Sequence, residues 1–325
     1  MCVLLGYANC RQHDACEFAE WLLNAIHENL RACRASGVAT AAVTRAAAYT
    51  TVADMVDEGR ATEGAVAIGP HGAPTTEAAL YWHELVQRES SVVYGQCFGL
   101  FESTLACTSS SCGASNTKFD FFSVVHVPLP PLPAGAASIQ LTDALASFSA
   151  FELVSAKCAK CASTAGAKKK LELCGEFLPQ LLIVQLKRFS ETEFSVHTKN
   201  STLVEFALDG LDLGPHVRGC APGGALYDCI AMSNHFEGSA GISSGSGGGG
   251  FGHYTTHARR GPAAPWYCYD DANPPVALES PSKADAYVLF FYRRGGPGRK
   301  DQTGRGQTMG YTACSSGSQM TDGGA

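Results

Sequence analysis

Apolar positions in the segment QHDACEFAEWLLNAIHENLRAC recur every four residues, which predicts an amphipathic helix. Asp14 and Glu17 open this segment and are typical of an aspartate form of the capping box, in which side chains satisfy the first backbone N–H groups of a helix. A second helix is expected over residues 75–88, TTEAALYWHELVQR. The apolar stripe of the first helix consists of Phe18, Leu22, Ile26 and Leu30.

Strand-like patterns dominate from about residue 92 onward. Segments there are rich in β-branched and aromatic residues and are separated by Gly, Pro and Asn. Helices first and a large sheet later indicate an α+β fold. The segments are SVVYGQCFGLF, KFDFFSVVHVPLP, FLPQLLIVQLKRF, ALYDCIAMSNHF, GHYTTHARR and ADAYVLFFYRR.

Two stretches fall outside these patterns. Residues 34–76 are rich in Ala, Gly and Thr with little apolar periodicity, and we expect an insertion there. Residues 295–325 are rich in Gly, Ser and Thr, which is typical of a disordered tail. No apolar run reaches the ~18 residues of a membrane span. The N-terminus lacks the pattern of a secretory signal, so we expect a cytoplasmic or nuclear protein without a membrane partner.

Composition and net charge limit the kinds of partner and of cysteine chemistry to be expected. A chain of 325 residues that is 45% hydrophobic is large enough to bury a substantial core. The net charge of -6 argues against nucleic acid as the main partner and suits a basic peptide or protein. In a reducing compartment, the 14 cysteines favour thiols, metal ligands or a nucleophile over a disulfide framework.

Four of the cysteines have metal-ligand spacing. Cys107 and Cys112 bracket four residues in CTSSSC, and Cys158 and Cys161 bracket two in CAKC. Two such pairs can close a tetrahedral thiolate site, because Zn²⁺ accepts about two to four residues between paired ligands. This zinc would be structural, since four protein ligands leave no open position for chemistry. The alternative is four unrelated thiols in a cysteine-rich chain.

His253 stands between a glycine run and a strand-like segment, in GGGGFGHYTTHARR. Asp270 follows seventeen residues later in WYCYDD and would lie beside it if the two segments form a hairpin. An imidazole oriented by a carboxylate is the base of Cys-His-Asp hydrolases. We therefore expect a ring nitrogen of His253 within about 3.5 Å of an Asp270 oxygen. The alternative is a surface histidine at a glycine-rich turn.

Five motifs follow one another along the chain, with both cysteine pairs before the second: QHDACEF, LLIVQLKRF, FGHYTTHAR, WYCYDD and AYVLFFYRR. Together they resemble the catalytic domain of ubiquitin-specific proteases, which would occupy residues 1–294. The resemblance implies a papain-like cysteine protease fold with a helical thumb, a palm sheet and zinc-bearing β-fingers, the fingers being residues 95–175. It also implies thiol-dependent hydrolysis of the bond after the terminal glycine of ubiquitin, with ubiquitin and ubiquitinated proteins as partners.

Roles follow from matching each motif to the family. His253 matches the general base and Asp270 the acid that orients it. Asp14, Glu17 and Tyr254 match substrate-binding positions near the channel for the basic tail of ubiquitin; for the two acids, the helix cap is an alternative that is compatible with this role. Residues 247–250 match a mobile loop over that channel, with a lengthened linker as the alternative.

The family's N-terminal box, an Asn several residues before the nucleophilic Cys, has no counterpart here. Only eleven residues precede QHDACEF, whereas the box should lie several dozen residues before it. Cys10 and Cys16 lie near a helix N-terminus, where thiol pKa values fall, but neither occupies the nucleophile's place. We therefore expect a truncated copy of an active enzyme, inactive as it stands. The alternatives are a ubiquitin-binding module without a nucleophile and a zinc-stapled interaction domain that does not bind ubiquitin.

Overall fold

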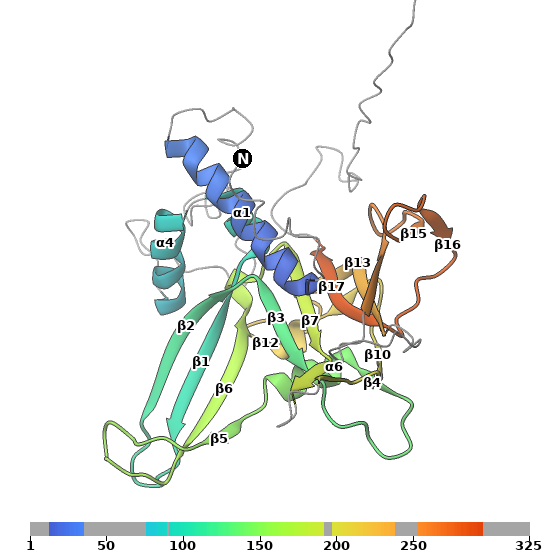
Figure 1. The fold of residues 1–325 in the computed structure, drawn as a ribbon. Coiled ribbons are helices and arrows are strands. Elements are labelled where there is room, and N and C mark those ends of the chain that lie inside the picture. Colours follow the sequence, from blue (N-terminus) through green and yellow to red (C-terminus); the bar gives the residue numbers. More distant parts are fainter. Residues whose placement is uncertain (1–12, 36–75, 90, 192–196, 238–251, 295–325) are drawn as a thin grey trace, which may run out of the picture.

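The computed structural model describes residues 13–35, 76–89, 91–191, 197–237 and 252–294 (Figure 1). Helices come first and two large sheets follow, which confirms the α+β class. Most of the predicted insertion and all of the predicted tail and glycine run lie outside the described residues. No helix among those described is long and apolar enough to cross a membrane.

The palm is an eight-stranded sheet in the order β16-β15-β14-β13-β17-β7-β3, with β11 paired to β13. All its pairs are antiparallel except β3 with β7. The last described strand, β17, therefore lies between two strands that precede it in the sequence. The palm strands are β3 (Val124–Pro128), β7 (Leu181–Lys187), β11 (Leu211–Asp212), β13 (Leu226–Glu237), β14 (Gly252–Ala258), β15 (Trp266–Tyr269), β16 (Val276–Leu278) and β17 (Ala286–Arg293).

The fingers are a five-stranded sheet in the order β12-β6-β1-β2, with β5 also paired to β6. Its long strands run away from the palm, and the cysteine pairs lie in the turns at their far end (Figure 1). Small pairs β4 with β10 and β8 with β9 complete the sheets. The remaining strands are β1 (Gly99–Cys107), β2 (Ser115–Phe122), β4 (Ser138–Gln140), β5 (Glu152–Val154), β6 (Ala167–Cys174), β8 (Phe189–Glu191), β9 (His197–Lys199), β10 (Leu203–Glu205) and β12 (Val217–Arg218).

Three helices form the thumb, and α6 packs near the palm (Figure 1). The two predicted long helices are confirmed as α1 and α4. Trp82 of α4 stacks on Phe177 and joins Leu100 of the fingers in one apolar cluster, which holds the thumb against the fingers. The helices are α1 (Ala15–Ala35), α4 (Glu77–Glu89), α5 (Val92–Cys97) and α6 (Leu141–Phe148), with short 3-10 turns at Gly175–Phe177 and Gly214–His216.

The apolar stripe predicted for α1 is not the face that the helix buries. Phe18, Leu22 and Ile26 are 42%, 40% and 42% exposed, whereas Cys16 and His27 are 1% and 3% exposed. His27 can be buried because its Nδ1 is hydrogen-bonded to Ser91 Oγ at 2.7 Å, and buried polar atoms are normally hydrogen-bonded. The apolar periodicity predicted the helix correctly. It did not predict which face is buried, because that face includes His27, whose partner Ser91 lies outside the helix.

The segment SVVYGQCFGLF was predicted as a strand, and its first half is the helix α5. Ser91 caps this helix by accepting a hydrogen bond from the Tyr94 backbone N–H at 3.3 Å. Tyr94 then stacks on Phe98, with ring centroids 4.0 Å apart. The cap and this packing outweigh the strand propensity of the two adjacent valines.

Candidate active site

His253 and Asp270 meet at the end of the palm sheet. β14 and β15 pair antiparallel with Thr256 opposite Tyr269, so the predicted hairpin forms. His253 Nε2 lies 2.7 Å from Asp270 Oδ1, within the predicted distance, and both side chains are partly exposed. Nε2–H therefore donates to the carboxylate, and Nδ1 is the ring atom left to accept a proton. Asn273 Nδ2 donates to the other oxygen of Asp270 at 3.4 Å.

Gly252, the residue before His253, is required by a close contact. A Cβ atom at this position would meet His235 Nε2 at 2.1 Å, far inside any real contact. The His235 ring in turn packs edge-on against Tyr254, with centroids 4.8 Å apart. The glycine thus allows β14 to lie against His235, and this packing sets the position of the strand that carries His253.

Asp14 joins the thumb helix to the palm. Its Oδ1 accepts hydrogen bonds from the backbone N–H groups of Cys16 at 2.8 Å and Glu17 at 3.0 Å, which confirms the predicted N-cap. Its Oδ2 accepts from the hydroxyl of Tyr287 in β17 at 2.6 Å. Both oxygens of Asp14 are therefore engaged within the protein.

Two buried phenols keep their protons around Asp14. Burial raises the pKa of Tyr254 to about 12, and the negative charge of Asp14 adds to the effect. Burial and its hydrogen bond to Asp14 also raise the pKa of Tyr287. A protonated phenol can donate to a carboxylate, as the Tyr287 hydroxyl does to Asp14 Oδ2. Sequence reasoning assigned Tyr254 to substrate binding and did not anticipate Tyr287.

A second path links α1 to the palm through Gln185. Gln185 Nε2 donates to the Tyr287 hydroxyl at 2.6 Å, and its Oε1 lies 2.5 Å from His126 Nδ1. His126 Nε2 lies 3.7 Å from Glu20 of α1. Gln185 and Tyr287 both occur inside the quoted motifs, but their spacing gave no signal of a polar role, because each lies in an apolar strand pattern.

Replacing Tyr287 with Phe is expected to lower the free energy of unfolding by about 1–3 kcal/mol. The reason is that Asp14 Oδ2 and Gln185 Nε2 would both lose the Tyr287 hydroxyl as their hydrogen-bond partner where α1 meets the palm. Urea unfolding followed by circular dichroism measures this change. Tyr292→Phe on the same strand is the matched control, since Tyr292 is 37% exposed. Equal stability of the two variants would show that the contact between α1 and the palm does not depend on the Tyr287 hydroxyl.

Glu17 and the candidate nucleophile Cys16 differ in their exposure to solvent. Glu17 is exposed, and within the described ranges its carboxylate has no hydrogen bond or ion pair. Cys16 is 1% exposed and packs beside Ile183 and Tyr287. Burial, followed by the charges of nearby acids, raises the pKa of Cys16 to about 12, which disfavours the thiolate. Cys10 lies outside the described residues.

The predicted zinc cysteines converge at the tip of the fingers. The sulfurs of Cys107 and Cys161 lie 3.8 Å apart, those of Cys112 and Cys158 lie 3.7 Å apart, and all four lie within 4.8 Å of one another. Tetrahedral ligands with Zn–S bonds of about 2.3 Å are about 3.8 Å apart. The four residues therefore fit Zn²⁺.

The family model and the similar sequences all point to the same protein family. A family model described as ubiquitin carboxyl-terminal hydrolase matches residues 5–291. Ubiquitin carboxyl-terminal hydrolase 21 of Mus musculus is 27% identical over 293 residues, which are 88% of this chain and 47% of the relative. Ubiquitin carboxyl-terminal hydrolase 2 of Gallus gallus is 28% identical over 88% of this chain and 69% of the relative. The chain thus spans about half the length of the mouse relative.

Solved structures with the same fold include the SAGA DUB module of Ubp8, Sgf11, Sus1 and Sgf73. One such structure has a TM-score of 0.56 at 20% identity and covers 88% of this chain and 51% of that chain. Another, bound to monoubiquitin, has a TM-score of 0.51 at 21% identity over 67% of this chain and 48% of that chain. These similarities show the fold and confirm the architecture expected from the motifs.

Proposed function

The chain belongs to the ubiquitin carboxyl-terminal hydrolase family, and from this premise we propose that it is a cysteine-type deubiquitinase domain. Such a domain hydrolyses the isopeptide or peptide bond after the C-terminal glycine of ubiquitin. The observation that supports the proposal most directly is the 2.7 Å contact between His253 Nε2 and Asp270 Oδ1. It leaves Nδ1 as a base for a thiol, the arrangement of a Cys-His-Asp hydrolase.

In the proposed reaction, His253 Nδ1 takes the proton of a cysteine thiol, and the thiolate attacks the glycine carbonyl carbon. The imidazolium then gives that proton to the leaving lysine amine as the C–N bond breaks. A water molecule, deprotonated by the same ring, hydrolyses the thioester and regenerates the thiol. Asp270 holds the ring in the tautomer with the proton on Nε2 and stabilises the imidazolium.

We place the nucleophilic thiol of the proposed reaction outside the described residues. Among those described, no cysteine sulfur is hydrogen-bonded to His253, and the only cysteine of the first motif, Cys16, is buried. The proposal therefore assigns His253 and Asp270 to catalysis and leaves the nucleophile to a segment carrying the Asn–Cys box.

For substrate binding we assign different roles to the three predicted residues. Glu17 is exposed and offers its carboxylate to the basic tail of ubiquitin. Asp14 and Tyr254 act as positioning residues, because Asp14 bonds the start of α1 and Tyr287, and the Tyr254 ring packs against His235 beside it in the palm. At the fingers, the cysteine cluster (Cys107, Cys112, Cys158 and Cys161) would hold Zn²⁺, which when bound supplies a structural cross-link between the two turns.

A second candidate function is a ubiquitin-binding module that does not cleave. It is favoured by one observation, the lack of a described thiol at His253. Both candidates predict that the chain binds ubiquitin, so binding alone does not separate them.

Hydrolysis of a ubiquitin–aminocoumarin amide tests the proposal. The 325-residue chain alone should release no coumarin and should not couple to a thiol-reactive ubiquitin probe. The same chain with an Asn–Cys box supplied upstream, from its gene or a related enzyme, should do both. A folded, ubiquitin-binding protein that carries the box and stays inactive would favour the binding module. Probe labelling of the original chain that is lost on replacing Cys10 or Cys16 would show that the nucleophile was placed wrongly.

A further inference from the structure

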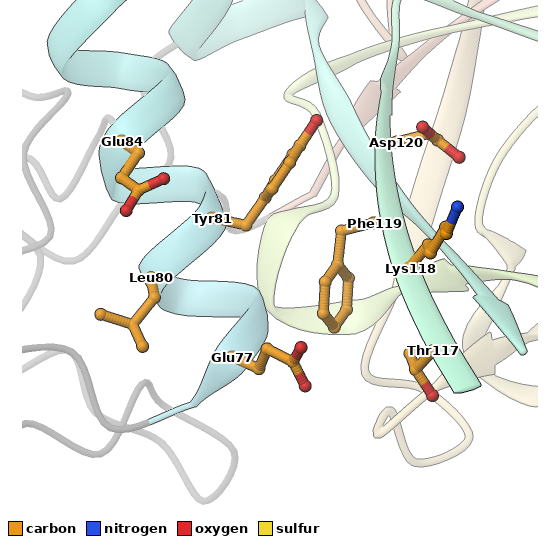
Figure 2. A pocket seen from close by; sticks show the side chains of 8 residues that line it. All are labelled: Glu77, Leu80, Tyr81, Glu84, Thr117, Lys118, Phe119 and Asp120. Atoms are coloured by element: carbon orange, nitrogen blue, oxygen red, sulfur yellow. The ribbon is translucent and has the colours of Figure 1, made fainter. Parts of the chain in front are cut away.

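A groove runs between helix α4 and strand β2, at the junction of thumb and fingers (Figure 2). Its volume is about 450 Å³. This is within the range of sites that hold small ligands or a few residues of peptide. The rings of Tyr81 of α4 and Phe119 of β2 both lie between the two elements, with ring centroids 6.2 Å apart. None of the lining residues belongs to the candidate active site or to the cysteine cluster.

One wall of the groove is the unpaired edge of a sheet. Among the described strands, β2 ends the fingers sheet and pairs only with β1. The Cys107 backbone N–H bonds Ala114 O at 2.9 Å, and alternation along an antiparallel pair then directs the N–H and C=O groups of Asn116 and Lys118 toward β1. The backbone groups of Thr117 and Phe119 therefore face outward, and both residues line the groove. In the described part of the chain, no hydrogen bond uses these outward groups.

The opposite wall carries negative charge. Glu77 and Glu84 lie on the groove side of α4, seven residues and about 10 Å apart along the helix. Neither glutamate has an ion pair or hydrogen bond in the described ranges. Lys118 and Asp120 border the groove from β2 but point away from α4 (Figure 2), so they do not offset this charge.

Between the glutamates the surface is apolar. Leu80 is 49% exposed and lines the groove together with Tyr81 and Phe119, so an apolar side chain entering the groove would meet these three residues. A strand that pairs with β2 would place alternate side chains over this floor. Its unpaired backbone would complete the hydrogen bonds of Thr117 and Phe119.

We propose that this groove binds an extended segment of a protein partner, which adds as a strand to the edge of β2. The segment carries an apolar side chain that fits between α4 and β2, flanked on the same strand face by lysines or arginines that pair with Glu77 and Glu84. The inference does not depend on catalysis, because its residues lie apart from His253 and Asp270.

The probe is a labelled peptide, acetyl-Thr-Lys-Val-Leu-Val-Lys-Thr-amide, in which both lysines and the leucine share one strand face. Fluorescence anisotropy with the full chain should show saturable binding. Glu77→Lys and Glu84→Lys should each weaken binding about threefold or more, and together about tenfold. Glu279→Lys changes the net charge equally at an exposed residue after β16 and should have no effect.

Backbone pairing is tested on the peptide, which leaves the protein intact. In a strand only alternate N–H groups face β2, so N-methylation of the leucine and of the adjacent valine should differ. One modification should abolish binding and the other should be tolerated. Equal tolerance of both modifications, no saturable binding, or binding insensitive to the two glutamate reversals would each overturn the proposal.

Discussion

Replacing His253 with alanine, in the chain supplied with an Asn–Cys box, is expected to lower turnover by about 10³-fold or more. The reason is the bonding at the ring: Nε2 is held by Asp270 at 2.7 Å, so Nδ1 is the atom that can take the thiol proton. Without the ring, the thiol keeps its proton at neutral pH, and the leaving amine has no acid. Turnover of a ubiquitin–aminocoumarin amide measures the loss, with ubiquitin affinity determined in parallel.

Two further variants separate catalysis from folding. Asp270→Asn keeps an oxygen that accepts from Nε2–H and should retain more activity than Asp270→Ala, because the asparagine still orients the ring. His83→Ala changes a histidine of α4 that lies outside the site and should leave turnover unchanged. Near-normal turnover of His253→Ala, in a protein that still needs its box cysteine, would remove His253 from the mechanism.

The second large effect is expected at the fingers. Cys158→Ser together with Cys161→Ser should abolish binding of about one zinc per chain, because two of the four converging sulfurs are lost. Structural zinc sites contribute several kcal/mol or more to folding. The thermal midpoint should therefore fall by roughly 10 °C or more in a chain of this size. Elemental analysis and thermal unfolding, with and without chelator, measure both changes.

Cys268→Ser is the matched control for zinc, because Cys268 lies in the palm and is a thiol outside the cluster. It should keep its metal and its stability. If wild-type protein is purified without stoichiometric zinc and its thermal midpoint does not change on adding chelator, the four cysteines are unrelated thiols and not a metal site. Hydrogen exchange adds a spatial test: loss of zinc should expose β1 and β6 near Cys107 before the palm strands.

The parts of the fold that were predictable depend on local pattern. The helices α1 and α4 have strong periodicity, and the resemblance of the motifs around His253 and Asp270 to the family pointed to a pair that the hairpin of β14 and β15 then brings together. The cysteine spacing indicated the metal site, but the contacts that close it, Cys107 with Cys161 and Cys112 with Cys158, join two different turns and depend on the pairing of β1 with β6.

The parts that were not predictable depend on contacts between distant segments. The buried face of α1 is set by Ser91, which lies 64 residues after His27. Asp14 Oδ1 caps its own helix, but the bond that Oδ2 accepts comes from Tyr287, 273 residues away, so no local window contains both partners. The groove between α4 and β2 has the same origin, because its walls meet only after thumb and fingers pack together.

The place of β17 in the palm has a consequence for how the protein is made. A ribosome releases the chain from its N-terminus. The strands on either side of β17, β7 and β13, are therefore synthesised before the strand that joins them. Tyr287, which bonds Asp14, is also in β17. Until residues 286–293 leave the exit tunnel, the nascent chain lacks the strand that joins β7 to β13, and Asp14 of the thumb lacks its bond from the Tyr287 hydroxyl, so apolar strand faces stay exposed to chaperones.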